Sequence, residues 1–136
     1  MADFGQVEKS AKWLGSGDLE PKDRFVAVFV PSKTRDGKPL NHDAWRDQMV
    51  YQMSKLFGGA TTVPAFGGWL DEERGGQVKQ EAISMVGSFI TADEWNEGNV
   101  FELKRFIHRM GREAQQGEIE VLLNGTFWRI RSFDSE

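Results

Sequence analysis

The pattern of apolar and polar residues first indicates a strongly hydrophobic strand in the early part of the chain. All six residues from Phe25 to Val30 are apolar, and most of them are β-branched or aromatic. A strand that is apolar on both sides is usually central in its sheet, because both of its faces are covered. Pro31 ends this strand, and residues 32–40 are predicted to form a loop.

Two longer stretches repeat apolar residues at every third or fourth position, which predicts amphipathic helices. The first is expected from about Asn41 to Phe57 and the second from about Asn99 to Gln116, with an asparagine as the N-cap of each. Gly117 is expected to end the second helix. Their buried faces are expected to contain Trp45, Met49, Met53 and Leu56 in the first helix, and Val100, Leu103, Ile107, Met110 and Ala114 in the second.

Further segments have the pattern of strands. They are residues 60–71, 77–91, 118–123 and 126–131. In the first of them, Pro64 lacks an N–H group and Gly67-Gly68 weakens the run, so this segment is expected to be an edge strand or to contain a bulge. Asn124-Gly125, between the last two segments, is a strong hairpin signal.

The resulting order of elements is β-α-β-β-α-β-β, and its first six elements match the split βαβ plan of ferredoxin-like domains. We therefore expect an α+β fold in which an antiparallel sheet carries two helices on one face and a C-terminal β-hairpin strand. The other face would be open, and aromatic residues there would favour dimerisation or ligand burial. Residues 21–136 are assigned to this single domain, and residues 1–20 to an N-terminal extension that is poorly ordered or forms a short helix.

The composition excludes several classes of protein. The absence of cysteine excludes disulfides and thiolate chemistry, and with two histidines in the chain no metal site or cofactor is expected. No apolar run approaches the roughly 20 residues of a membrane span. The N-terminus lacks a basic start followed by an apolar stretch, so a cytoplasmic protein is expected. The net charge of −4 argues against nucleic-acid binding by the whole surface, although not by a local basic patch.

A resemblance to a known family rests on three groups of residues. They are Leu56-Phe-Gly-Gly-Ala-Thr61, then Gly67-Gly-Trp69 followed by Glu81, and Met110-Gly-Arg-Glu113 before the final strands. This pattern, spread over about residues 25–130, resembles a family of small bacterial ferredoxin-like proteins with no established activity. The resemblance implies the ferredoxin-like fold and contains no catalytic signature.

The first candidate site is a basic face on the second predicted helix. It contains Lys104, Arg105, His108, Arg109 and Arg112, which helical spacing places away from the apolar side. Arginines arrayed in this way can bind phosphates or carboxylates, so the face is a candidate anion or nucleic-acid site. The alternative is a solvated face whose cations complement the helix dipole, because acidic residues precede them in the chain.

The second candidate site is the glycine-rich hairpin with Trp69 and Glu81. Glycines let a ligand approach closely, a tryptophan offers a flat apolar wall, and a partly buried Glu81 could serve as an acid or a base. The alternative places Trp69 in the core and leaves Glu81 in solvent or in an ion pair.

The two histidines are weaker candidates for catalysis. His42, near the start of the first predicted helix, is expected to be exposed. His108 is flanked by arginines that would lower its pKa and keep it neutral, as a base requires, but no carboxylate lies one helical turn before it. The sequence contains no phosphate-binding or dinucleotide-binding glycine motif and no G-x-S-x-G nucleophile motif.

These features favour a non-catalytic binding or interaction module over an enzyme. Five tryptophans and ten phenylalanines exceed what one modest core needs, so we expect a homodimer or docking on a protein partner through the sheet face. A phosphate-bearing partner could then contact the basic helix, nucleic acid is a less favoured partner, and a membrane is not expected. The alternative is a small cofactor-free enzyme of the proton-transfer or isomerase type, with a pocket between sheet and helices that uses Glu81 or His108.

Overall fold

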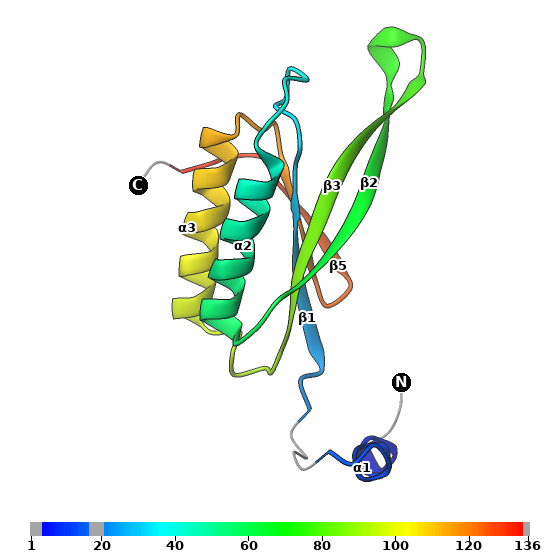
Figure 1. The fold of residues 1–136 in the computed structure, drawn as a ribbon, viewed down its shortest axis with the longest axis vertical. Helices are drawn as coiled ribbons and strands as arrows, with labels where there is room; N and C mark the ends of the chain where they lie inside the picture. Colours follow the sequence, from blue (N-terminus) through cyan, green and yellow to red (C-terminus); the bar gives the residue numbers. More distant parts are fainter. Residues whose placement is uncertain (1–3, 17–20, 135–136) are drawn as a thin grey trace.

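The computed structural model describes residues 4–16 and 21–134. The elements in chain order are α1 (Phe4–Trp13), β1 (Arg24–Val30), α2 (His42–Phe57), β2 (Thr61–Asp71), a short 3₁₀ helix η1 (Glu72–Arg74), β3 (Gln77–Ile90), α3 (Glu97–Glu113), β4 (Ile119–Leu123) and β5 (Thr126–Ile130). Within the described residues, five strands form one antiparallel sheet in the order β2-β3-β1-β4-β5. Helices α2 and α3 lie side by side on one face of this sheet (Figure 1). The predicted ferredoxin-like α+β fold is therefore confirmed, including its C-terminal hairpin strand.

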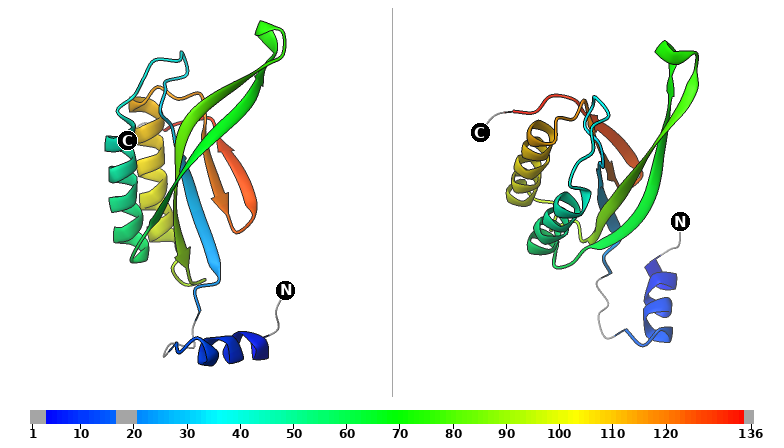
Figure 2. Two further views of the ribbon diagram at one scale, coloured as in Figure 1. Left: turned by 45° about the vertical axis from the view of Figure 1, so that its right-hand side comes forward. Right: turned by 45° about the horizontal axis from the view of Figure 1, so that its top comes forward.

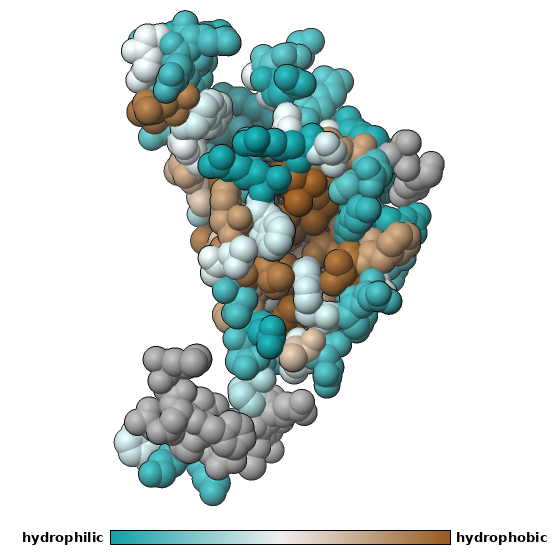
Figure 3. Space-filling model, turned by 180° about the vertical axis from the view of Figure 1, so that it is seen from behind, coloured by the Kyte–Doolittle hydropathy of each residue, from teal (hydrophilic) through white to brown (hydrophobic). Residues whose placement is uncertain are grey.

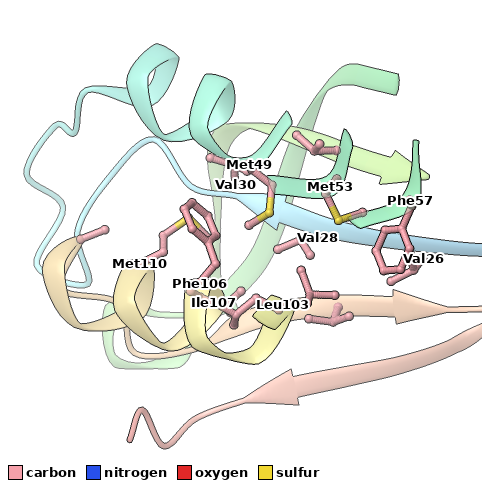
Figure 4. Close-up of a cluster of buried hydrophobic side chains, with 14 of the residues drawn as sticks. Val26, Val28, Val30, Met49, Met53, Phe57, Leu103, Phe106, Ile107 and Met110 are labelled. Carbon is pink, nitrogen blue, oxygen red and sulfur yellow. The ribbon is translucent and has the colours of Figure 1, made fainter. Parts of the chain in front are cut away.

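The core lies between the sheet and the two helices. β1 occupies the centre of the sheet, as its pattern predicts, and Val26, Val28 and Val30 on its helix-facing side are completely buried. They are covered by side chains of α2 and α3, which interdigitate above the strand (Figure 4). The main contributors from the helices are Met49, Met53, Phe57, Leu103, Phe106, Ile107 and Met110.

Helix α2 begins and ends where the sequence predicts. The Asn41 side chain accepts a hydrogen bond from the N–H group of Ala44 and so caps the first turn. Gly58 ends the helix in the left-handed conformation, with a φ of 88°, which glycine adopts without the steric cost that a side chain brings.

Helix α3 differs from the prediction at both ends. Its N-cap is Asn96, whose side chain accepts a hydrogen bond from the N–H group of Asn99. The Asn99 side chain instead donates to the carbonyl of Glu94, a contact between a turn and a helix that spacing alone does not reveal. At the other end, Gln115 takes the left-handed conformation with a φ of 51°, so the helix stops before Gly117.

Strands β2 and β3 continue past the rest of the sheet as a two-stranded ribbon (Figure 2). Their register is unbroken from Thr61 opposite Gly87 to Asp71 opposite Gln77. Pro64 therefore marks an edge strand, one of the two predicted alternatives, and not a bulge. The large apolar side chains that the ribbon exposes include Phe66, Trp69, Leu70 and Val78.

The N-terminal extension contains the short helix α1, which lies apart from the sheet and the other helices (Figures 1 and 2). Trp13 and Leu14 near its end are 94% and 86% exposed, so neither side chain packs on the domain. Residues 1–3 and 17–20 of the predicted extension lie outside the described residues. The open face of the sheet is thus left uncovered by the described part of the extension.

We expect Met53→Ala to lower the free energy of unfolding by about 2–5 kcal/mol, because Met53 is completely buried and its truncation leaves a cavity. The control Lys55→Ala, at an exposed position of the same helix, should change that free energy by less than about 0.5 kcal/mol. Urea denaturation followed by circular dichroism measures both. Equal losses in the two variants would contradict the placement of Met53 in the core.

Candidate functional site

The open face of the sheet is the side that α2 and α3 do not cover. Side chains alternate along a strand, so Phe25 and Phe29 of β1 point away from the buried valines. Residues directly opposite on neighbouring strands share a face, which places Phe89 of β3 beside Phe25. On β4 and β5, Leu122 lies opposite Phe127 in the same way. The open face is therefore predominantly apolar and aromatic.

Four phenylalanines form two ring pairs on the open face. The ring centroids of Phe25 and Phe89 are 4.8 Å apart, and those of Phe29 and Phe127 are 6.4 Å apart in an edge-to-face arrangement. Phe89 and Phe127 are 60% and 48% exposed. Apolar surface outside the core is also visible on the rear side of the molecule, where hydrophobic residues gather in the middle and hydrophilic residues surround them (Figure 3).

A close contact between the Phe25 ring and the backbone of β3 shapes the first of these ring pairs. The ring of Phe25 lies over Gly87 of β3, and a Cβ atom at Gly87 would be only 2.3 Å from the Cζ atom of Phe25. The missing side chain at Gly87 thus lets the Phe25 ring lie close against the sheet.

Two glutamates lie on the open face beside the aromatic rings. Glu81 of β3 lies on the same side of its strand as Met85, which is opposite Phe29. The Oε2 atom of Glu81 accepts hydrogen bonds from the N–H groups of Ser32 at 2.7 Å and Lys33 at 3.1 Å. These bonds hold the start of the loop after β1. Glu81 is therefore bound to backbone amides, which neither interpretation of the sequence anticipated.

Glu120 of β4 is the second glutamate, and the sequence analysis did not identify it. Burial raises the pKa of the Glu120 carboxyl, and the negative charges of Glu118 and Glu81 raise it further, while Arg129 acts in the opposite direction. Glu120 consequently keeps its proton to a higher pH than an ordinary glutamate does. It is the acidic group of this face best suited to donating a hydrogen bond or a proton.

The ribbon carries Trp69, which is half exposed and lies opposite Lys79. The alternative that placed Trp69 in the core is therefore wrong. Trp69 shares its side of the ribbon with Glu81, because Lys79 and Glu81 are two residues apart in the same strand. The Glu81 carboxylate, however, is directed to the backbone of residues 32–33.

Two hollows in the surface lie away from the two glutamates, although Gly87 and Phe89 of the open face line part of the first. One, of about 290 Å³, lies beside the C-terminal end of α2, and the other, of about 410 Å³, lies on the outer side of α2 and α3 next to Arg109. Neither hollow is lined by Glu81, Glu120 or His108.

His42 is half-buried, although the sequence analysis expects it to be exposed. Its Nδ1 atom is 2.9 Å from the carbonyl oxygen of Pro31, and its Nε2 atom is 2.7 Å from the Ser84 hydroxyl. A carbonyl oxygen can only accept, so Nδ1 carries the proton and Nε2 accepts from Ser84. His42 therefore joins the start of α2 to β1 and β3. The Ser84 partner is 42 residues away in the chain, which hides this role from sequence patterns.

The predicted basic face lies along α3, but its cations are paired within the chain. The Lys104 Nζ atom is 3.0 Å from the carboxylate of Asp134, and Arg105 lies 3.5 Å from the carboxylate of Glu102. Arg112 donates a hydrogen bond to the carbonyl oxygen of Asp134. The face consequently presents less free positive charge than the sequence indicates.

Arg109 was expected to extend into solvent and is instead half-buried between α2 and α3. Its guanidinium lies over the rings of Phe106 and Trp45, at 5.0 and 5.9 Å from their centroids, and donates to the Gln48 side chain. Stacking on aromatic rings and a hydrogen bond to a neighbouring helix give Arg109 a packing role.

His108 receives an unexpected partner from the C-terminal end of the chain. Its Nδ1 atom accepts a hydrogen bond of 2.7 Å from the N–H group of Asp134, so Nδ1 carries no proton. Burial lowers the pKa of His108, as do the charges of Lys104 and Arg112, against the opposing effect of Asp134. The expected direction is thus present, with burial as its main cause. Asp134 is 26 residues from His108 in the chain, and no local pattern links them.

In the part of the chain that the structure describes, no three histidine or acidic side chains are grouped so that they could hold a metal ion. Nor does any described helix combine the length and apolar character needed to cross a bilayer.

We expect Glu120→Gln to raise the melting temperature at neutral pH and to change it little at acidic pH. A carboxyl whose pKa folding raises stabilises the folded state while it is protonated, and this stability is lost as the pH rises through the folded pKa. Glutamine has no such loss. Thermal melts from acidic to neutral pH compare the two proteins. Glu113→Gln, at an exposed position of α3, is the control. A difference that does not vary with pH would contradict the raised pKa.

Comparisons with known proteins give a match in fold alone. No protein-family model matches the sequence, and no curated protein matches it significantly. The structure is similar to that of a phage SAM lyase in complex with S-methyl-5′-thioadenosine, with a TM-score of 0.55, 13% sequence identity, and coverage of 83% of this chain and 92% of the lyase chain. A phage SAM lyase in the apo state matches with a TM-score of 0.53 at 13% identity, with the same coverage. The resemblance to small bacterial ferredoxin-like proteins stays a prediction.

Proposed function

We propose that the protein is a non-catalytic interaction module whose copies associate through the open face of the sheet. The observation that carries this proposal is the exposure of Phe89 and Phe127 on a face that no described helix covers. Burial of apolar surface favours association, and aromatic side chains are common energetic centres of interfaces. The charged residues on the same side of the sheet include Lys79, Glu81, Glu120 and Arg129.

The β2–β3 ribbon supports the same proposal. An isolated two-stranded ribbon is marginally stable in water, and this one exposes Phe66, Leu70 and Val78. These three side chains lie on the side of the ribbon that continues the helix-covered face, whereas Trp69 continues the open face, so contact with a second copy through the open face would cover Trp69. With this function we also propose a bacterial, cytoplasmic protein, as the sequence analysis expects. The absence of cysteine agrees with the cytoplasmic location, because such a chain needs no oxidising compartment.

Association through the open face does not require the basic face of α3. A phosphate-bearing partner of the kind the sequence analysis considered would have to compete with Asp134 for Lys104 and Arg112. The open face needs no such rearrangement before it binds.

Phe89→Ser should shift the protein toward the monomer, because it removes an exposed ring from the proposed interface. Light scattering coupled to size-exclusion chromatography, over a wide concentration range, measures the shift. Phe101→Ser is the matched control: Phe101 is 57% exposed but lies on α3, so the oligomer should persist. A wild-type protein that is monomeric at every concentration would refute the proposal.

A second candidate function is a small enzyme that binds a nucleoside-type ligand on the open face. Two observations favour it. The Glu120 carboxyl, whose pKa burial raises, lies on the same face as aromatic rings on which a base can stack. The fold is also similar to that of a phage SAM lyase whose structure contains S-methyl-5′-thioadenosine. In this function, Glu120 would donate to the ligand while Glu81 keeps the adjoining loop in place.

Under this second function, isothermal titration calorimetry should detect binding of S-methyl-5′-thioadenosine to the wild-type protein. Glu120→Ala should weaken the binding about two- to thirteen-fold, since the loss of one hydrogen bond to a polar ligand costs about 0.5–1.5 kcal/mol. Glu113→Ala on α3 serves as the control and should bind like the wild type. The absence of binding heat with the wild-type protein at millimolar ligand would exclude this ligand.

A further inference from the structure

The last described residues of the chain lie across α3, in the helical layer of the molecule. After β5 the backbone leaves the sheet and crosses α3, where Phe133 and Asp134 make its main contacts (Figure 1). We call Phe133–Asp134 the tail segment. Its binding surface is formed by a helix and is separate from the open face of the sheet, so the inference that follows does not rest on the proposed function.

Phe133 fills a notch that exists because residue 111 is glycine. A Cβ atom at Gly111 would lie 2.5 Å from atoms of the Phe133 ring, which is too close for any side chain. The His108 ring meets the same phenylalanine edge to face, with 5.9 Å between the ring centroids. Glycine weakens a helix relative to alanine. At Gly111 the absence of a side chain provides the space that holds an aromatic ring.

Three side chains of α3 bind three different groups of Asp134. Lys104 pairs with its carboxylate at 3.0 Å, Nδ1 of His108 accepts from its N–H group at 2.7 Å, and Arg112 donates to its carbonyl oxygen. Lys104, His108 and Arg112 are four residues apart in succession, so they form one stripe along the helix. The stripe thus binds the carboxylate of Asp134 together with the N–H group and the carbonyl oxygen of the same residue.

These contacts suit a peptide better than a nucleic acid. A phosphate can pair with Lys104 and Arg112, but a phosphate diester has no N–H group to donate to Nδ1 of His108. Nor does it supply the ring in the Gly111 notch from the residue directly before the acid. The surface therefore recognises an aromatic residue, a backbone N–H group and a carboxylate in a fixed order.

We propose that Lys104, His108, Gly111 and Arg112 form a binding site for peptide segments in which an aromatic residue directly precedes an acidic one. The tail segment occupies this site in cis, and a segment of the same chemistry from a partner protein displaces it.

Displacement requires the Phe133 ring to leave its contact with the core residues, but the hold on Asp134 is superficial. The side chains of Asp134 and Lys104 are 65% and 53% exposed, and ion pairs between exposed groups contribute little to stability. Residues 131–132, which connect the tail segment to β5, belong to no helix or strand. A tethered segment of this kind competes at an effective concentration of about millimolar, so an incoming peptide has to overcome that competition.

The test uses the full-length protein and the probe peptide acetyl-Gly-Ser-Phe-Asp-Gly-amide, followed by NMR titration of backbone amide signals. In the variant Phe133→Ala/Asp134→Ala, we expect saturable shifts at residues 104–112. Binding should be about tenfold tighter than in the wild type, where the tethered tail segment competes. The milder variant Asp134→Ala, which keeps the packing of Phe133, should show a smaller gain in affinity.

Gly111→Ala, added to the double variant, supplies the matched control. Alanine favours the helix but fills the notch, so the fold should persist while peptide binding is lost. A second probe in which Ala-Asn replaces Phe-Asp should not bind to any variant.

Three results would overturn the proposal. They are the absence of saturable shifts in both tail variants, peptide binding that Gly111→Ala leaves unchanged, and binding of the Ala-Asn probe as strongly as the Phe-Asp probe. A short DNA duplex is titrated in parallel. If it binds the double variant more tightly than the Phe-Asp peptide does, the stripe is an anion site and the peptide assignment is wrong.

Discussion

The central strand β1 is apolar on both of its faces, and helices cover only one of them. Both helical connections in this fold cross from one strand to a parallel strand, and the fixed hand of such crossovers places α2 and α3 on the same side of the sheet. Val26, Val28 and Val30 take that side and form the core. Phe25 and Phe29 are thereby turned to the other side, where no described helix packs on the sheet. The aromatic open face follows from the connection of the strands and from the composition of β1 together.

The end of β1 is held by two residues, His42 and Glu81, that the sequence suggests as candidates for catalysis. His42 binds the carbonyl oxygen of Pro31, and Glu81 binds the N–H groups of Ser32 and Lys33. Backbone polar groups that leave a sheet need new partners, and a side chain from a distant element often provides them. Both residues thus have a structural use that accounts for their positions. Glu120 on the open face differs from them, because burial near other carboxylates raises its pKa.

Helix α3 has a different use on each of its sides. One side packs into the core, Arg109 stacks beside α2, and the stripe of Lys104, His108 and Arg112 binds the tail segment. The cations of α3 therefore have different partners, and their shared positive charge does not by itself indicate one common binding site. Three of the five residues that indicate a polyanion site in a helical projection, Lys104, His108 and Arg112, contact a single aspartate and its backbone in three dimensions.

Local order along the chain accounts for the elements that could be predicted from the sequence. The central position of β1, the Asn41 cap of α2, the edge position of β2 and the turn at Asn124-Gly125 each depend on residues within a few positions of one another. Propensity, capping and alternation act at that range, so the order of the elements along the chain and the aromatic character of the sheet could be derived from them.

Contacts between distant segments decided the rest. The hydrogen bond from Ser84 to His42, the meeting of Asp134 with His108, and the approach of Glu81 to Glu120 join residues that no sequence spacing connects. Hydrogen-bond partners and desolvation depend on distances through space, and these exist only once the chain has folded. For this reason the sequence identified an aromatic sheet and a basic helix, whereas the tertiary structure alone decided which of their groups are free to bind.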